Sequence, residues 1–239
     1  MAGNRKRLFG KVPRWRIALR LAGIHAFRDD YFESPWSDWE QRIKEGHQKE
    51  MDWIEKQSQN WTGTDYEFGE IFGEDYVRSR DLTNNMYAAL VVSIWSEMEN
   101  FLKTLIRMSY SVLGEQKTPP ARIDQIKNDF ENKLGVKLEK CKSYSTVDAI
   151  RLLNNLFKHD SGYCDPESEE YKKIKKSSTA KQAIPDKRKH DTRWRAGKIE
   201  VKYSALPLQD IILACNGFCT DLLGKVEIKL KNRLEEAEI

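Results

Sequence analysis

Hydrophobic residues recur at helical spacing along most of the chain. The strongest pattern lies in Asp81–Val112, where two apolar stripes run side by side. A helix that is apolar this far around its surface is expected to be central in the fold. The same spacing predicts three further helices: Ser37–Gln59, Arg122–Leu134 and Pro207–Glu236.

The segment Thr146–Gly162 is predicted to be an amphipathic helix that ends in a basic cluster. Its apolar positions form one face: Val147, Ile150, Leu153, Leu156 and Phe157. Arg151, Asn155 and Lys158 follow one another at i, i+4 and i+7 on the other face, and His159 comes at the end of the helix. These side chains are suited to handling a phosphate. The alternative is a solvated helix end whose basic residues are favoured by the helix dipole.

Polar segments separate the predicted helices. Asn60–Tyr76 is expected to be a partly ordered loop, and Ser161–Arg195 an insertion or long loop without periodicity. Lys198–Tyr203 alternates strictly and predicts a short strand. We therefore expect an all-α fold of four to five helices around one core. Residues 1–75 are expected to form an N-terminal helical extension, made of a basic arm and a polar helix. Residues 76–239 are expected to form a helical domain, and its basic insertion holds the short strand.

Positive charge is concentrated in two parts of the 239-residue chain, although the net charge is only +4. Residues 1–28 contain eight Lys/Arg and no Asp or Glu, and residues 172–202 contain twelve Lys/Arg against three acids. Because Tyr171, Trp194 and Tyr203 are interleaved with this second segment, it suits single-stranded RNA. The candidate RNA-binding residues are Lys187, Arg188, Lys189, Arg193, Trp194 and Arg195. The alternatives are a solvated loop and, for the arm, an acidic partner or an anionic surface.

Other functional classes lack support in the sequence. The cysteines show no disulfide framework, which favours a reducing, cytoplasmic compartment. Cys215 and Cys219 are interpreted as buried apolar residues, because no further ligands have zinc-finger spacing. No apolar run is long enough for a membrane span, and no GxxxxGK[ST] or GxSxG motif is present. We expect no cofactor, no metal and no membrane partner. The remaining histidines are expected at the surface: His25, His47 and His190.

Two segments together resemble the HEPN superfamily. Ser93–Ile106, SIWSEMENFLKTLI, resembles the first core helix of HEPN domains, with Glu99 at the acidic position. Arg151–Gly162, RLLNNLFKHDSG, resembles the third-helix signature in its variant with Arg, then Asn, then Lys-His. The two segments occur in the family's order, with a helix between them and a long helix after them. The resemblance covers roughly 81–236 and implies that residues 76–239 form an HEPN-like helical domain, an up-and-down bundle of four to five helices.

The resemblance implies RNA cleavage. Many HEPN proteins are metal-independent endoribonucleases of prokaryotic toxin–antitoxin, abortive-infection and CRISPR-type defence systems, typically homodimers whose two Arg/His motifs meet in one cleft. By this resemblance His159 takes the role of the family His, Arg151 that of the Arg and Asn155 the polar position. His can move protons near neutral pH, and Arg151 or Lys158 would stabilise the phosphorane. Glu99 would orient Arg151 or His159 across the helix pair, or else be a half-buried acid paired with a structural Arg.

The spacing of the motif departs from the usual family pattern, in which Arg precedes His by four to six residues. Here seven residues separate Arg151 from His159, and Asn154 occupies the nearer position. The two side chains are about 80° apart around an ideal helix and are expected to converge if the helix frays at Lys158. The departure leaves open a non-catalytic HEPN module that binds RNA or a protein within a toxin–antitoxin or defence complex.

Overall fold

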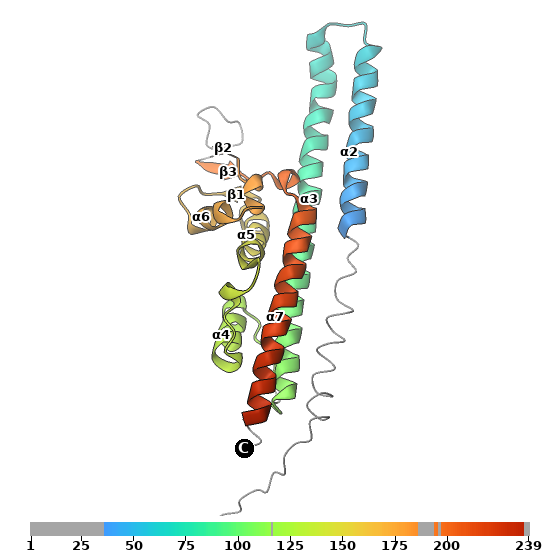
Figure 1. Cartoon of the computed structure of the whole chain (residues 1–239). Helices are drawn as coiled ribbons and strands as arrows, with labels where there is room; N and C mark the ends of the chain where they lie inside the picture. The colour runs from blue at the N-terminus through green and yellow to red at the C-terminus, as the bar shows by residue number, and fades with distance from the viewer. Residues whose placement is uncertain (1–35, 116, 186–193, 196, 237–239) are drawn as a thin grey trace, which may run out of the picture. The chain divides into compact units, whose positions relative to one another are not determined.

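The computed structural model describes residues 36–115, 117–185, 194–195 and 197–236. Within them the chain is mostly helical, which confirms the all-α class (Figure 1). The helices are α2 (Trp36–Gln59), α3 (Asp65–Val112), α4 (Ile123–Leu134), α5 (Tyr144–Asp160), α6 (Glu169–Lys176) and α7 (Leu208–Glu236). The basic arm lies outside the described residues. None of the described helices is long and apolar enough to cross a membrane.

The described residues divide into two compact units. One, the helical unit, contains residues 97–144 and 216–236, and the other, the site unit, contains residues 36–96 and 145–215. Helix α3 is continuous through residues 75 and 76, so no break in secondary structure marks the expected domain boundary there. The division into residues 1–75 and 76–239 stays a prediction.

Helix α3 begins much earlier than the sequence pattern suggests. The prediction of a loop over Asn60–Tyr76 is wrong from Asp65 onward. Thr64 and Glu67 form a reciprocal capping box: the backbone N–H of Glu67 donates to Thr64 Oγ1 at 3.3 Å, and that of Thr64 donates to Glu67 Oε2 at 2.9 Å. Aromatic rings in edge-on or tilted contact then support the first turns: Trp53, Trp61, Phe68 and Phe72.

Within the site unit, α2 and the part of α3 before residue 97 lie side by side and antiparallel (Figure 1). His47 of α2 is half-buried, and its Nδ1 lies 3.1 Å from Ser79 Oγ and 3.3 Å from Thr83 Oγ1, both on α3. His47 is therefore only partly exposed at the surface, and it contacts side chains of the neighbouring helix. Its ring links the two helices, because Nδ1 can exchange hydrogen bonds with either hydroxyl.

The predicted insertion Ser161–Arg195 contains regular structure. Strand β1 (Tyr163–Cys164) precedes helix α6, whose N-cap Ser168 accepts a hydrogen bond from the backbone N–H of Tyr171. The strand predicted within Lys198–Tyr203 is confirmed as β3 (Lys198–Glu200). It is the central strand of a small antiparallel sheet, flanked by β1 and β2 (Trp194–Arg195).

In the helical unit, α4 ends at Gly135 as the sequence predicts. Gly135 has φ +66°, and its N–H and that of Val136 bond to carbonyls of the last helical turn. Cys219 is fully buried in this unit, and its Sγ lies 3.7 Å from the sulfur of Met98. In the site unit Cys215 is buried too, which confirms that both cysteines are buried residues.

Candidate functional site

A pocket of about 400 Å³ lies along the polar face of α5 in the site unit. Three of the predicted site residues line it: Arg151, Asn155 and His159. They follow one another at intervals of four residues, about one helical turn each. The rest of the lining includes Tyr163 of β1, Lys198 of β3, the α6 N-cap Ser168, and Glu170 and Lys173 of α6.

The three α5 residues reach the same pocket without any unwinding of the helix. Helix α5 stays regular through Lys158 to Asp160, so the expected fraying at Lys158 is not needed. The chain then reverses through Ser161 and Gly162, which have φ values of 52° and 80°. The N–H of Gly162 bonds to the carbonyl of Leu156 at 3.0 Å, the backbone pattern of a helix C-cap that glycine favours. This reversal places Tyr163 in the pocket wall directly after the helix.

Arg151 is held by an acid that is not among the predicted site residues. Its Nε donates to Asp148 Oδ1 at 2.9 Å, and the two side chains are only 18% and 14% exposed. Asp148 is one turn earlier on α5. The ion pair fixes the guanidinium by its Nε, while its terminal nitrogens make no hydrogen bond to any residue in the described ranges. Those donors are therefore available to an anion in the pocket.

His159 and Lys158 differ in their relation to the pocket. Both side chains are exposed, but only His159 is part of the lining. Within the described part of the chain, His159 has no hydrogen bond or ion pair. Its imidazole is accordingly able to take up or release a proton at a bound molecule.

The pocket also contains carboxylates. Asp160 forms an ion pair with Lys198 Nζ at 3.3 Å, and Asp165 Oδ1 accepts a hydrogen bond from the backbone N–H of Glu167 at 2.9 Å. Glu170 adds a third acid to the lining and Lys173 another cation. The balance of charge is mixed, so recognition of an anion depends on the donors of α5 rather than on a uniformly positive wall.

The cysteine beside the pocket is unsuited to nucleophilic chemistry. Cys164 of β1 is fully buried, and this burial raises the pKa of its thiol to about 11. The thiol therefore stays protonated at neutral pH, and the thiolate is the reactive form.

The other predicted site residues lie elsewhere or outside the described residues. Glu99 belongs to the helical unit. It forms an ion pair at 2.5 Å with Nζ of Lys103, which lies one turn further along α3. Trp194 and Arg195 form the short strand β2. Four candidate RNA-binding residues fall outside the described residues: Lys187, Arg188, Lys189 and Arg193.

Several residues of the pocket were not predicted as site residues: Tyr163, Ser168, Lys173 and Lys198. Ser168 followed by Glu169 and Glu170 is a sequence signal for a helix start, and it could have located α6. The positions of Tyr163 and Lys198 depend on sheet pairing, because Tyr163 is paired with Glu200 in β3.

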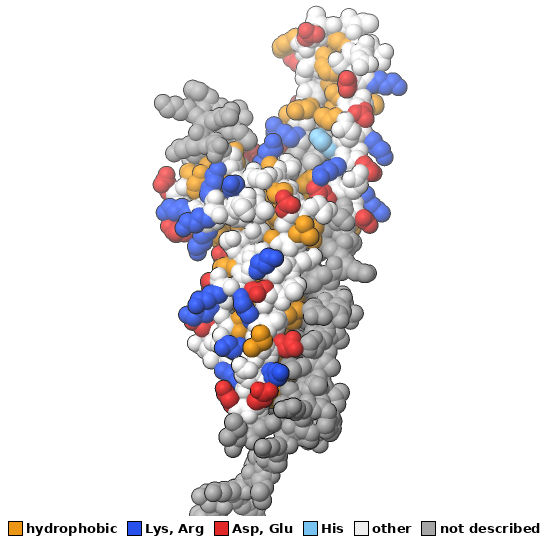
Figure 2. Space-filling view, viewed as in Figure 1, with side chains coloured by type: hydrophobic (Ala, Val, Ile, Leu, Met, Phe, Trp, Pro, Cys, Tyr) orange, Lys and Arg blue, Asp and Glu red, His pale blue; other side chains and the backbone are white. Residues whose placement is uncertain are grey.

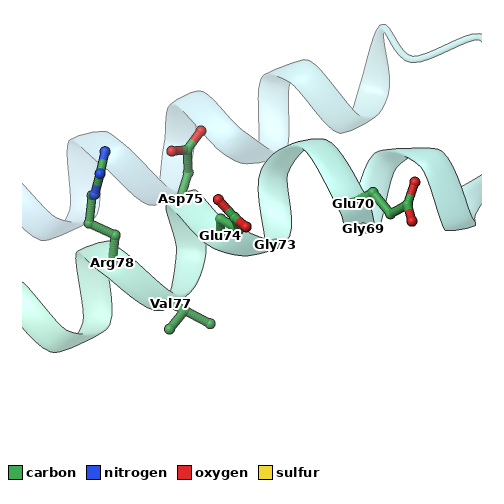
Figure 3. Close-up of a pocket in the computed structure, with 7 residues that line it drawn as sticks. All are labelled: Gly69, Glu70, Gly73, Glu74, Asp75, Val77 and Arg78. Carbon is green, nitrogen blue, oxygen red and sulfur yellow. The ribbon is translucent and has the colours of Figure 1, made fainter.

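A second pocket, of about 750 Å³, lies along α3 in the site unit (Figure 3). Its lining comes from one helix: Gly69, Glu70, Gly73, Glu74, Asp75, Val77 and Arg78. Figure 3 shows Asp75 and Arg78 on one side of the α3 ribbon and Val77 on the other. Its lining offers carboxylates and one Arg from a single helix, whereas the α5 pocket combines an imidazole, a guanidinium and an amide with residues of other elements, so the α5 pocket is the better candidate site.

Comparisons with known proteins do not assign a family. No family model matches the chain, and no curated protein or solved structure matches it significantly. The resemblance to HEPN domains therefore stays a prediction from the two quoted segments. Across the described residues, no group of three or more His, Cys, Asp or Glu side chains is arranged to hold a metal ion.

Proposed function

We propose that this protein is a metal-independent endoribonuclease of the HEPN type that cleaves single-stranded RNA, acting in stress response or anti-phage defence. The observation that supports the proposal is the pocket on α5, where Arg151, Asn155 and His159 lie together. An imidazole, a guanidinium and an amide in one pocket provide proton transfer, charge stabilisation and orientation of a phosphodiester.

In the proposed reaction the ribose 2′-oxygen attacks the adjacent phosphorus and the bond from phosphorus to the 5′-oxygen breaks. His159 accepts the proton of the 2′-hydroxyl, and the same residue of a second protomer in the proposed homodimer protonates the leaving 5′-oxygen. Arg151 and Asn155 donate hydrogen bonds to the non-bridging oxygens as negative charge develops there. The products are a 2′,3′-cyclic phosphate and a 5′-hydroxyl.

The surface of α6 supports RNA as the substrate. Lysines crowd this helix next to the pocket: Lys172, Lys173, Lys175 and Lys176. Figure 2 shows Lys and Arg side chains gathered in the region of α6, with acidic side chains among them. Lysines beside a pocket attract the phosphates on either side of a scissile bond, and this attraction weakens with salt.

The decisive test is cleavage of single-stranded RNA in the presence of EDTA. We expect the wild-type protein to cut, and His159→Ala to lose a factor of about 10²–10⁴ in rate, the usual contribution of a general acid or base. The exposed α7 residue Gln209 is a suitable control, and Gln209→Ala should cleave like the wild type. Unchanged cleavage by His159→Ala would rule out the proposed role of this residue.

A second candidate function is a non-catalytic HEPN module that binds RNA or a partner protein such as an antitoxin. The observation that favours it is the ion pair of Arg151 with Asp148, together with the acids of the pocket lining. Under this proposal the wild-type protein binds single-stranded RNA without cutting it, and binding weakens as salt rises. Lack of binding at low salt would exclude the RNA-binding form and leave the protein-binding one.

A further inference from the structure

Asn154 is an unusual residue for its position on α5. It lies on the apolar side of the helix, is 3% exposed, and follows the fully buried Leu153. Its Oδ1 is buried and has no hydrogen-bond partner among the residues that the structure describes. A buried unpaired acceptor costs stability, because it loses its bond to water without gaining another. An apolar residue of similar size would avoid this cost, so the amide needs another explanation.

The hydrogen bond that Asn154 does make is directed toward the pocket. Its Nδ2 donates to Oδ1 of Asn155 at 3.2 Å, and Asn155 is part of the pocket lining. A side-chain amide has an acceptor end and a donor end of nearly equal size. Since the acceptor end of Asn155 is bonded to Asn154, its Nδ2 is left to donate.

We propose that Asn154 is a positioning residue, which fixes the carboxamide of Asn155 so that Nδ2 is the group offered to a phosphate oxygen in the pocket. This inference rests on the proposed function, since it concerns the same pocket and the same anion. Without the bond from Asn154, the Asn155 amide can turn over and present Oδ1, which repels a phosphate.

Two substitutions of Asn154 separate positioning from packing. Asn154→Leu removes the donor, so the Asn155 amide is no longer fixed. Asn154→Asp keeps the shape but, when ionised, only accepts, so Nδ2 of Asn155 turns toward it and Oδ1 faces the pocket. We expect kcat for RNA cleavage to fall about tenfold or more in both variants, the effect of losing one hydrogen bond to a charged group. In an Asn155→Ala background neither substitution should lower kcat further.

A matched control distinguishes this effect from general weakening of α5. Thr146 is also a buried polar residue of α5, and its Oγ1 lies 3.3 Å from Thr179 Oγ1, away from the pocket lining. Thr146→Val should lower the thermal midpoint and leave kcat unchanged. An Asn154→Leu variant with wild-type kcat would overturn the proposal.

A second measurement does not depend on RNA cleavage. In NMR spectra of the whole protein, the side-chain NH₂ signals of Asn155 should shift as inorganic phosphate is added, and this shift should be much smaller in Asn154→Leu and Asn154→Asp. Equal shifts in all three proteins would contradict the positioning role. A wild-type protein that shows the shift but does not cut RNA would contradict the proposed nuclease and support the role of Asn154.

Discussion

Tyr203 connects the segment after β3 to the backbone of α5. Its Oη donates to the carbonyl of Leu153 at 2.9 Å, and its ring packs edge-on against Phe157 with the centroids 5.8 Å apart. Tyr203→Phe keeps the ring and removes only the hydroxyl. We expect it to lower the free energy of unfolding by about 1 kcal/mol at neutral pH, measured by urea denaturation.

Because of Tyr203, we expect the free energy of unfolding to depend on pH. Burial raises the pKa of Tyr203 above its ordinary value of 10.0, so the folded state favours the neutral phenol. The stability that the neutral Tyr203 phenol contributes is fully present below pH 10, and it is lost as pH rises through the higher pKa of the folded state. The free energy of unfolding should therefore fall between neutral and strongly alkaline pH by less in Tyr203→Phe than in the wild type. Tyr66→Phe is the matched control, because it removes the same hydroxyl from a side chain that is 73% exposed.

At the scale of single residues, the sequence predicts what depends on helical spacing. The spacing places Arg151, Asn155 and Lys158 on one face of the helix, and the first two line the pocket. The third lining residue is His159 at the helix end, while Lys158 is not part of the lining. The ion pair of Asp148 with Arg151 and the burial of Asn154 were not predicted. The ion pair is an i, i+3 contact that helical spacing permits, but whether it forms depends on the side-chain rotamers. The burial of Asn154 depends on neighbours from other elements, which periodicity does not contain.

At the scale of elements, the contribution of the capping box to the stability of α3 should be measurable. Thr64→Ala removes the acceptor for the Glu67 N–H and the partner of its carboxylate. We expect a loss of about 1 kcal/mol in the free energy of unfolding and faster amide exchange in the first turns of α3. Thr62→Ala is the matched control, because Thr62 is exposed and precedes the helix. Equal exchange in both variants would show that the aromatic cluster alone fixes the helix start.

The predicted elements that failed have a common physical cause. Long helices such as α3 beyond Asp81, α4, α5 and α7 bury a repeated stripe, and the sequence predicts them within a few residues. Helix α6 buries only Ile174, and the first turns of α3 are supported by aromatic contacts and a cap despite two glycines. A single buried residue or a local cap leaves no repeating pattern of apolar residues in the sequence.

At the scale of the whole molecule, both compact units use the same two helices. Helix α3 passes from the site unit to the helical unit between residues 96 and 97, and α7 does so between 215 and 216. Because unfolding one unit would expose the ends of helices that continue into the other, we expect a single cooperative thermal transition.

Tryptophan fluorescence can test this coupling. The tryptophans of the described residues all lie in the site unit: Trp36, Trp39, Trp53, Trp61, Trp95 and Trp194. In a Trp15→Phe background, fluorescence therefore follows the site unit, while far-ultraviolet circular dichroism follows both units. The two melting curves should coincide. A circular dichroism transition that continues after the fluorescence change is complete would indicate independent units.

The sharp chain reversal after α5 has a consequence for how the site arises during folding. Apart from Lys198, every residue of the pocket lining lies between Arg151 and Lys173, so its parts are close neighbours in the sequence. Contacts of such short range need little loop closure and form quickly. We expect the pocket to assemble before the long-range pairing of α3 with the later segments. A site encoded in so short a stretch can also be altered by changes in that stretch alone, leaving the two long helices intact.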